Sequence, residues 1–263
     1  MKRRDALAGA LGLAAMLAVS GCGSSDTFGR SYTPIRYKLT AEVETPQGVK
    51  SGYSVIEVQW GMTGSMFGTQ GGSSFNVTGE AVAVDVAPGE TLFALLRSNT
   101  DPDWAAYATE NISFAKADDI DRDVFAPEDA TVADEVKSGV KDRAAQMAET
   151  ERYLDQLRSD NSVHPVKKLP YFVRFGDLRD PKSVERVDPD HLDKSFGEGF
   201  RLKALTIQIT DDPVTVGIEK RLGWLKGGGP LLDAGSIKAP PIGQPYPFAV
   251  TINNGDFVKG SKR

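Results

Sequence analysis

Apolar and polar side chains alternate along several short stretches of the chain, and this period of two predicts β-strands. The clearest stretch is 35–45, in which every second residue from Ile35 to Val43 is apolar and the residues between are polar or charged. A second alternating stretch, 54–60, follows the turn residues 46–48. We therefore predict an antiparallel hairpin with one face in water.

Further strands are expected on the same grounds. Two of them, 75–86 and 91–98, are separated by Ala87-Pro88-Gly89 and are predicted to form another hairpin. Single strands are predicted at 171–178, 201–210 and 248–253.

The stretch 128–158 has a different pattern, with apolar residues at helical spacing and charged residues on the other faces. The apolar positions are Val132, Val136, Val140, Ala144, Met147, Leu154 and Leu157. Short helices are predicted at 188–192 and 217–225. The sum is an α+β fold of mainly antiparallel sheets with one long amphipathic helix and short helices.

The first 21 residues have the pattern of a secretory signal peptide. Lys2, Arg3 and Arg4 precede an uncharged apolar run at 6–19, which is shorter than the roughly 20 residues that a membrane span needs. Export through the Sec route is expected, and the Arg3-Arg4 pair leaves the twin-arginine route open.

The residues Val19-Ser20-Gly21-Cys22 resemble the bacterial lipobox, and Cys22 is the only cysteine of the chain. The resemblance implies cleavage before Cys22, a diacylglycerol on its thiol, and a further acyl chain, such as palmitate, on the new amino group. The alternative is an ordinary secretory signal with a chance cysteine near its end. By the rule known for many Gram-negative lipoproteins, Gly23 in place of Asp favours the outer membrane, facing the periplasm, over the inner membrane.

These segments give an organisation for the whole chain. We expect a lipoprotein signal peptide at 1–21, a polar tether at 22–34 and a single α+β domain at 35–263. Within that domain, 118–166 is a possible helical insertion and 227–247 a loose Gly- and Pro-rich segment.

Composition limits the partners. The chain of 263 residues has a formal net charge of −5, which argues against nucleic acid because phosphate binding needs clustered Lys and Arg. The same charge disfavours electrostatic binding to an anionic bilayer, so the expected membrane contact is through acylated Cys22. A protein partner in the envelope is a further possibility.

Candidate chemistry is sparse, and we predict no catalytic residue, no cofactor and no metal site. His164 and His191 lack supporting motifs and are interpreted as surface residues. Asp119, Asp121 and Asp123 have the spacing that begins an EF-hand loop. However, the sixth and twelfth positions are Val124 and Ala130, which lack the turn glycine and the bidentate ligand.

Two features are candidate interaction sites. Trp60, Met62, Met66 and Phe67 border or lie in the glycine-rich loop 61–74, and could contact a lipid or a partner or fold back onto the sheet edge. The predicted long helix could join a partner helix or pack on the sheet of this protein. For both features we favour the intramolecular packing.

Two stretches, 37–58 and 180–225, resemble an uncharacterised family of bacterial proteins that are often predicted to be lipoproteins or secreted. The resemblance implies one folding unit from 35 to about 225 and no particular activity. The leading hypothesis is a membrane-anchored envelope lipoprotein that acts as a binding or structural module. The alternative is a periplasm-facing hydrolase that uses carboxylates, which a deep pocket with converging carboxylates or a His beside an Asp would favour.

Overall fold

A computed structural model describes residues 30–62, 73–111, 148–227 and 248–260. Several sequence-based predictions lie wholly or mainly outside these residues. They concern the signal peptide, Cys22, the glycine-rich loop, the acidic stretch at 119–130, most of the predicted long helix and the segment 227–247.

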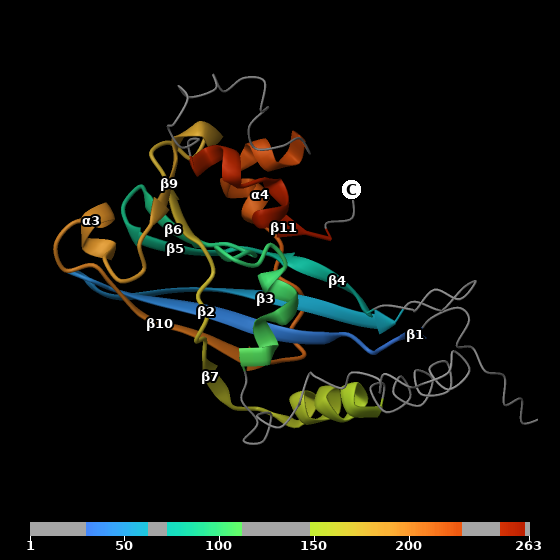
Figure 1. Ribbon diagram of the computed structural model, residues 1–263. Coiled ribbons are helices and arrows are strands. Elements are labelled where there is room, and N and C mark those ends of the chain that lie inside the picture. The colour runs from blue at the N-terminus through green and yellow to red at the C-terminus, as the bar shows by residue number, and fades with distance from the viewer. Residues whose placement is uncertain (1–29, 63–72, 112–147, 228–247, 261–263) are drawn as a thin grey trace, which may run out of the picture.

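The first sheet has seven antiparallel strands in the order β11-β4-β3-β2-β10-β7, with β1 paired to β3 (Figure 1). Their bounds are β1 Arg30–Ser31, β2 Ile35–Thr45, β3 Gly48–Met62, β4 Ser73–Glu80, β7 Val163–Pro165, β10 Arg201–Ile209 and β11 Val258–Lys259. The pairing of β2 with β3 confirms the predicted antiparallel hairpin.

The two faces of the first sheet have the predicted contrast. Alternate residues of β2, from Ile35 to Thr45, are buried, and the residues between them are partly exposed. Across the outer face, ion pairs join neighbouring strands. They are Arg36 with Glu57 at 2.7 Å, Lys203 with Glu42 at 3.0 Å and Arg201 with Glu44 at 2.6 Å.

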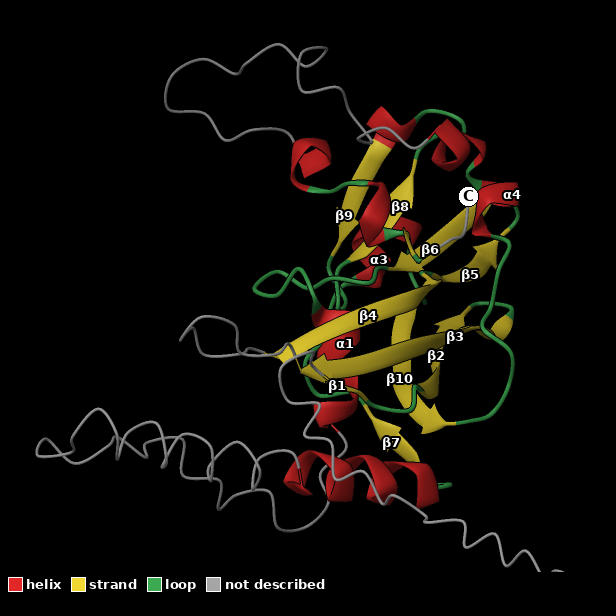
Figure 2. Ribbon diagram, turned by 90° about the vertical axis from the view of Figure 1, so that its right-hand side faces the viewer, coloured by secondary structure: helices red, strands yellow, loops and turns green. Residues whose placement is uncertain are grey.

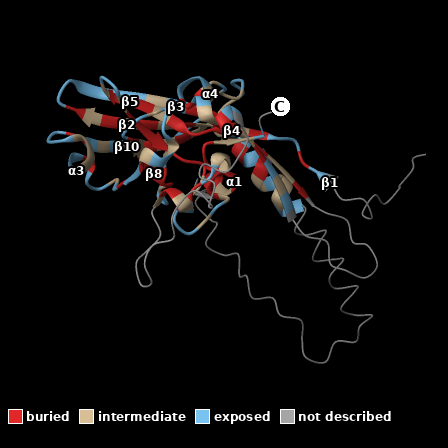
Figure 3. Ribbon diagram, turned by 90° about the horizontal axis from the view of Figure 1, so that it is seen from above, coloured by how far each residue is buried: buried red, intermediate tan, exposed pale blue. Residues whose placement is uncertain are grey.

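The second sheet has a hydrophobic core on each face, although its outer strands also carry exposed residues. Its order is β5-β6-β8-β9, with bounds β5 Val82–Ala87, β6 Glu90–Ala94, β8 Phe172–Phe175 and β9 Val184–Val187. Leu92 belongs to the core shared with the first sheet, whereas its neighbour Phe93 belongs to a second core on the opposite face. Figure 3 shows buried residues along the strands of both sheets.

The predicted strand 75–86 is divided between the two sheets. Its first part is β4, which pairs with β3, and its second part is β5, which pairs with β6 around the turn at Pro88 and Gly89. The second sheet then lies directly on the first at Gly52, where an added Cβ would be 2.1 Å from the carbonyl oxygen of Ala83. A glycine at this position therefore allows the two backbones to meet.

Short helices cover what the sheets leave open (Figure 2). On the first core lie α1 Trp104–Tyr107, η2 Ala108–Asn111 and the helical residues 148–159. On the second core lie α4 Ile218–Arg221, η5 Gly223–Gly227, η6 Phe248–Thr251 and η7 Asn254–Asp256. The remaining helices are η4 Pro181–Ser183 and α3 Leu192–Phe196.

The predicted α+β fold with one long amphipathic helix is wrong. The described residues are mainly antiparallel strands in two sheets with few short helices, and they contain no long amphipathic helix. Within 128–158, the structure describes residues 148–158, which are helical and bury Leu154 and Leu157. The predicted strand 248–253 is instead the 3-10 helix η6.

Candidate functional site

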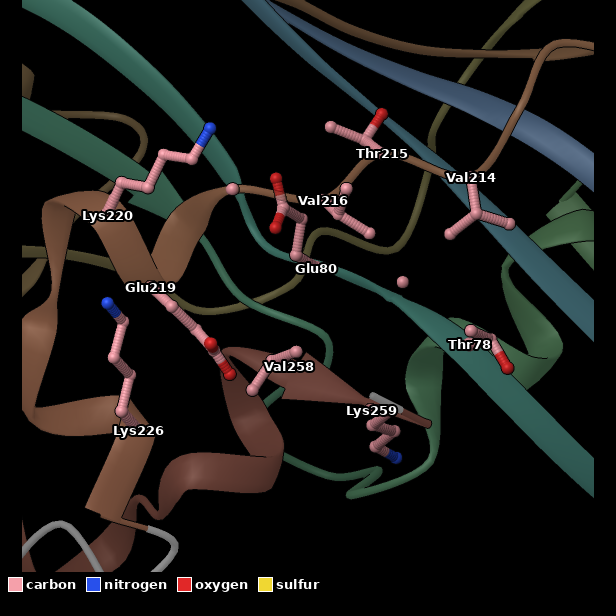
Figure 4. Close-up of a pocket in the computed structure, with 12 residues that line it drawn as sticks. Thr78, Glu80, Val214, Thr215, Val216, Glu219, Lys220, Lys226, Val258 and Lys259 are labelled. Carbon is pink, nitrogen blue, oxygen red and sulfur yellow. The ribbon is translucent and has the colours of Figure 1, made fainter. Parts of the chain in front are cut away.

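A pocket of about 300 Å³ lies where β4 ends and α4 begins (Figure 4). Residues Thr78–Glu80 of β4 form one part of its lining, and Val258 and Lys259 of β11 form another. The rest comes from the segment before α4 and from Glu219, Lys220 and Lys226. The pocket is thus built by segments that are distant in sequence.

The segment 210–217, here called the strap, forms the outer side of this pocket. Its first residue, Thr210, donates its backbone N–H to the carbonyl of Arg36 at 3.0 Å. Thr215 donates its N–H to the carbonyl of Val55 at 3.1 Å, and its Oγ1 accepts the N–H of Val55 at 2.8 Å. Although Val55 lies on the outer face of β3, it is 1% exposed. The strap therefore crosses that face and satisfies both backbone groups of Val55.

Glu80 is the buried carboxylate of the pocket, with 8% of its surface exposed. Its Oε2 accepts the backbone N–H of Ile218, the first residue of α4, at 2.8 Å. The first N–H groups of a helix have no partner within the helix, so this bond satisfies one of them. Glu80 consequently fixes the start of α4 to the end of β4.

Lysines and valines make up most of the remaining lining. Lys220 and Lys226 are exposed, whereas Lys259 donates to Asp103 Oδ1 at 3.2 Å and to the carbonyl of Pro102 at 3.3 Å. Among the described residues, no group of three His, Cys, Asp or Glu side chains could hold a metal ion. The arrangement offers a small, partly apolar recess with cationic side chains at its rim.

His164 lies beside Asp160. A histidine next to an aspartate is one of the two features that would favour the hydrolase alternative. Its Nε2 is 2.6 Å from Asp160 Oδ2, and the imidazole is 25% exposed. Asp160 Oδ1 accepts the N–H of Ser162 at 2.7 Å, and this backbone bond is the main reason that the pKa of Asp160 lies below its ordinary value. The Ser162 side chain also bonds to Asp160.

In this arrangement the carboxylate lies between the hydroxyl and the imidazole. Because a general base must reach the hydroxyl proton itself, the Ser162, Asp160 and His164 group has the wrong order for nucleophilic catalysis. It closes the turn between the helical residues 148–159 and β7. The other histidine, His191, has 53% of its side chain exposed and is 4.0 Å from Asp193 Oδ1.

An aromatic cluster lies at the end of the first sheet where β1 pairs with β3. Trp60 contacts Phe75 and Tyr107 at ring-centroid distances of 5.7 Å and 5.3 Å, and the last two are 5.5 Å apart. All three rings pack edge to face and are partly buried against the first core. Trp60 therefore packs on the sheet, whereas Met66 and Phe67 lie outside the described residues.

The fold is a pair of stacked antiparallel sheets with short helices. In the part of the chain that the structure describes, no helix combines the length and apolar character needed to cross a bilayer. No family model, curated protein or solved structure matches the chain. The resemblance of 37–58 and 180–225 to a bacterial family stays a prediction.

Proposed function

We propose that this protein is an envelope lipoprotein, anchored through acylated Cys22, whose β domain serves as a binding or structural module at the periplasmic side of the outer membrane. The observation that carries the proposal is the order of basic residues, apolar run and lipobox-like Val19–Gly21 immediately before the single cysteine.

The anchor would depend on lipid rather than on charge. Removal of residues 1–21, which include three basic residues and one acidic residue, changes the formal net charge from −5 to −7. An acidic body gains little from an anionic bilayer. Each buried methylene contributes about 0.8 kcal/mol, and several acyl chains together give a stable attachment that one chain does not.

The geometry favours a binding or structural module over the hydrolase alternative. The buried carboxylate of the pocket, Glu80, already accepts a backbone bond from Ile218. The His164–Asp160 pair lies in a turn of its own and has no correctly ordered hydroxyl. Neither feature supplies an activated nucleophile, whereas the pocket and the exposed face of the first sheet are surfaces on which a partner can bind.

Metabolic labelling tests the anchor. In a Gram-negative host grown with radiolabelled palmitate, the wild-type protein should carry label and Cys22→Ser should carry none. Ser25→Ala, a change three residues further on, should label as well as the wild type. Label on both Cys22→Ser and the wild type, or on neither, would refute acylation at Cys22. Crosslinking in intact cells followed by mass spectrometry would then identify the partner.

A further inference from the structure

The place where the chain enters the fold constrains how an anchored domain can sit on a bilayer. Arg30 and Ser31 of β1 pair with Met62 and Gly61 at the end of β3. Seven residues, 23–29, separate Cys22 from Arg30. At roughly 3.5 Å per residue, even a fully extended connection spans at most about 28 Å. The end of the sheet that contains β1 is therefore tied close to the anchor.

The opposite end of the sheet lies farther away than this connection can reach. β3 has 15 residues and begins at the turn with β2, next to Gln47. At 3.3 Å per residue it is about 45 Å long. Since the strand is longer than the connection, the domain cannot stand on the bilayer with its β2–β3 turn downward and β1 at the top. Two orientations remain, with the β1 end downward or with the sheet lying on its side.

The faces of the sheet decide between these two orientations. The outer face has cross-strand ion pairs such as Arg36–Glu57 and Lys203–Glu42. Laying such a face on lipid would desolvate charges without burying apolar area. By contrast, the strand residues at the β1 end include Ser31, Gly61 and Ser74, which carry no charge, and a single basic residue, Arg30, whose charge is opposite to that of anionic headgroups.

The aromatic cluster at the β1 end contains one tryptophan whose indole N–H differs from those of the other two. The indole N–H groups of Trp104 and Trp224 donate to the carbonyls of Lys168 and Leu178, at 2.8 Å and 2.9 Å. Among the described residues, Trp60 has no such acceptor, although its ring packs on the core. Aromatic side chains with an apolar ring and a polar tip are enriched at membrane–water interfaces, where headgroups accept the remaining hydrogen bond.

From these observations we infer that the β1 end of the first sheet is the membrane-facing surface of the domain, with the cluster of Trp60, Phe75 and Tyr107 directed to the phospholipid headgroups. The inference rests on the proposed lipid anchor, which brings the domain to the bilayer. It leaves the β2–β3 turn and α3 as the parts directed away from the membrane.

Fluorescent labels at the two ends test this orientation. Cys22 is acylated in the anchored protein, so a cysteine introduced at exposed Ser74 or at exposed Gln47 is the only free thiol. The lipidated full chain, as Ser74→Cys or Gln47→Cys, is placed in phosphatidylethanolamine–phosphatidylglycerol vesicles with headgroup nitroxides. Quenching should be several-fold stronger at position 74 than at position 47. Equal quenching, or stronger quenching at 47, overturns the orientation.

Intrinsic fluorescence gives an independent test of the aromatic cluster. With brominated lipids, the wild-type fluorescence should be quenched, and Trp60→Phe should lose most of that quenching. Trp224→Phe, which changes a tryptophan of the second core, should retain it. If Trp224→Phe loses the quenching and Trp60→Phe keeps it, the cluster does not face the lipid.

Flotation of the same vesicles separates this inference from the proposed function. If the purified protein does not float with the vesicles, the lipid anchor itself is wrong. If it floats and the labels at 74 and 47 are quenched equally, the anchor stands and the inferred orientation fails.

Discussion

The two sheets differ in how many of their faces meet water. The first sheet has one buried face and one polar face, and β2 alternates accordingly from Ile35 to Thr45. The second sheet has a core on each side, and Thr91 to Ala94 of β6 are all buried. Alternation in a sequence thus marks a half-buried strand, whereas a fully buried strand appears as a continuous apolar run that also suits a buried helix.

The difference between the two sheets can be measured at single residues, and truncation of Phe93 should give the largest loss of stability. Its side chain is fully buried in the second core, where it contacts the rings of Phe175 and Phe257. We expect Phe93→Ala to lower the free energy of unfolding by about 3–5 kcal/mol, measured by urea denaturation. Leu92→Ala, on the opposite face of the same strand, should cost about 2–5 kcal/mol.

A matched change on the first sheet completes this test. Thr40 lies on the outer face of β2, and Thr40→Ala should cost no more than about 1 kcal/mol. A loss at Thr40 as large as that at Phe93 would show that the outer face is covered in solution.

The contact between the sheets should be sensitive to any side chain at Gly52. A Cβ at this position would be 2.1 Å from the Ala83 carbonyl oxygen, which belongs to backbone and cannot turn aside. Gly52→Val should therefore destabilise the protein by about 3 kcal/mol or prevent folding. Gly223→Ala, where nothing lies within 4 Å of the added Cβ, is the control and should be nearly neutral. Thermal melts of similar midpoint for both variants would rule out the direct contact of the two backbones.

The attachment of α4 to the end of β4 depends on Glu80. Glu80→Ala should lower the free energy of unfolding by about 1–3 kcal/mol, because the N–H of Ile218 loses its buried acceptor. Glu80→Gln keeps an acceptor oxygen and should cost less. Hydrogen exchange of the Ile218 amide provides the measurement, with faster exchange expected in the alanine variant. Equal protection in wild type and Glu80→Ala would mean that the bond does not hold α4.

The helices on the second sheet include Asp256, a buried carboxyl group. Its burial disfavours the charged form. Desolvation raises the pKa of Asp256 above its ordinary value of 3.8, although the Asn253 N–H and Arg97 act in the opposite direction. The stability that the protonated group contributes is fully present below pH 3.8 and is lost as the pH rises through the raised pKa. The wild type should therefore lose stability relative to Asp256→Asn over that range.

At pH 7, Asp256→Asn should be as stable as the wild type or slightly more stable, since the amide oxygen still accepts the Asn253 N–H. Asp256→Ala lacks the acceptor and should lose about 1 kcal/mol. Urea titrations at several pH values provide the measurement. If the wild type instead becomes more stable relative to Asp256→Asn as the pH rises, the pKa of Asp256 is not raised.

The first sheet was predicted from the sequence better than the second. Alternation located β2 at its observed bounds and β10 to within one residue, whereas β9 of the second sheet has only four residues and shows no such pattern. The division of 75–86 between two sheets depends on packing against Gly52 and Ile56, which are distant in sequence from 75–86. Tertiary contacts of this kind leave no local periodicity.

The candidate sites, too, could be predicted from the sequence only where their residues are contiguous. The pocket brings together β4, β11, the strap and α4, which no spacing rule connects. Glu80 was one acidic residue among 36 Asp and Glu, and its role became visible only through its bond to Ile218. Cys22 could be singled out because its signal is contiguous in sequence, and its acylation stays a prediction.

The mass of the N-terminal peptide of the mature protein, isolated from bacterial membranes, shows whether Cys22 is the acylated N-terminus. We predict a peptide that begins at Cys22 and carries the mass of a diacylglycerol and an amide-linked acyl chain. A peptide that begins upstream of Cys22, or one with an unmodified thiol, would contradict it.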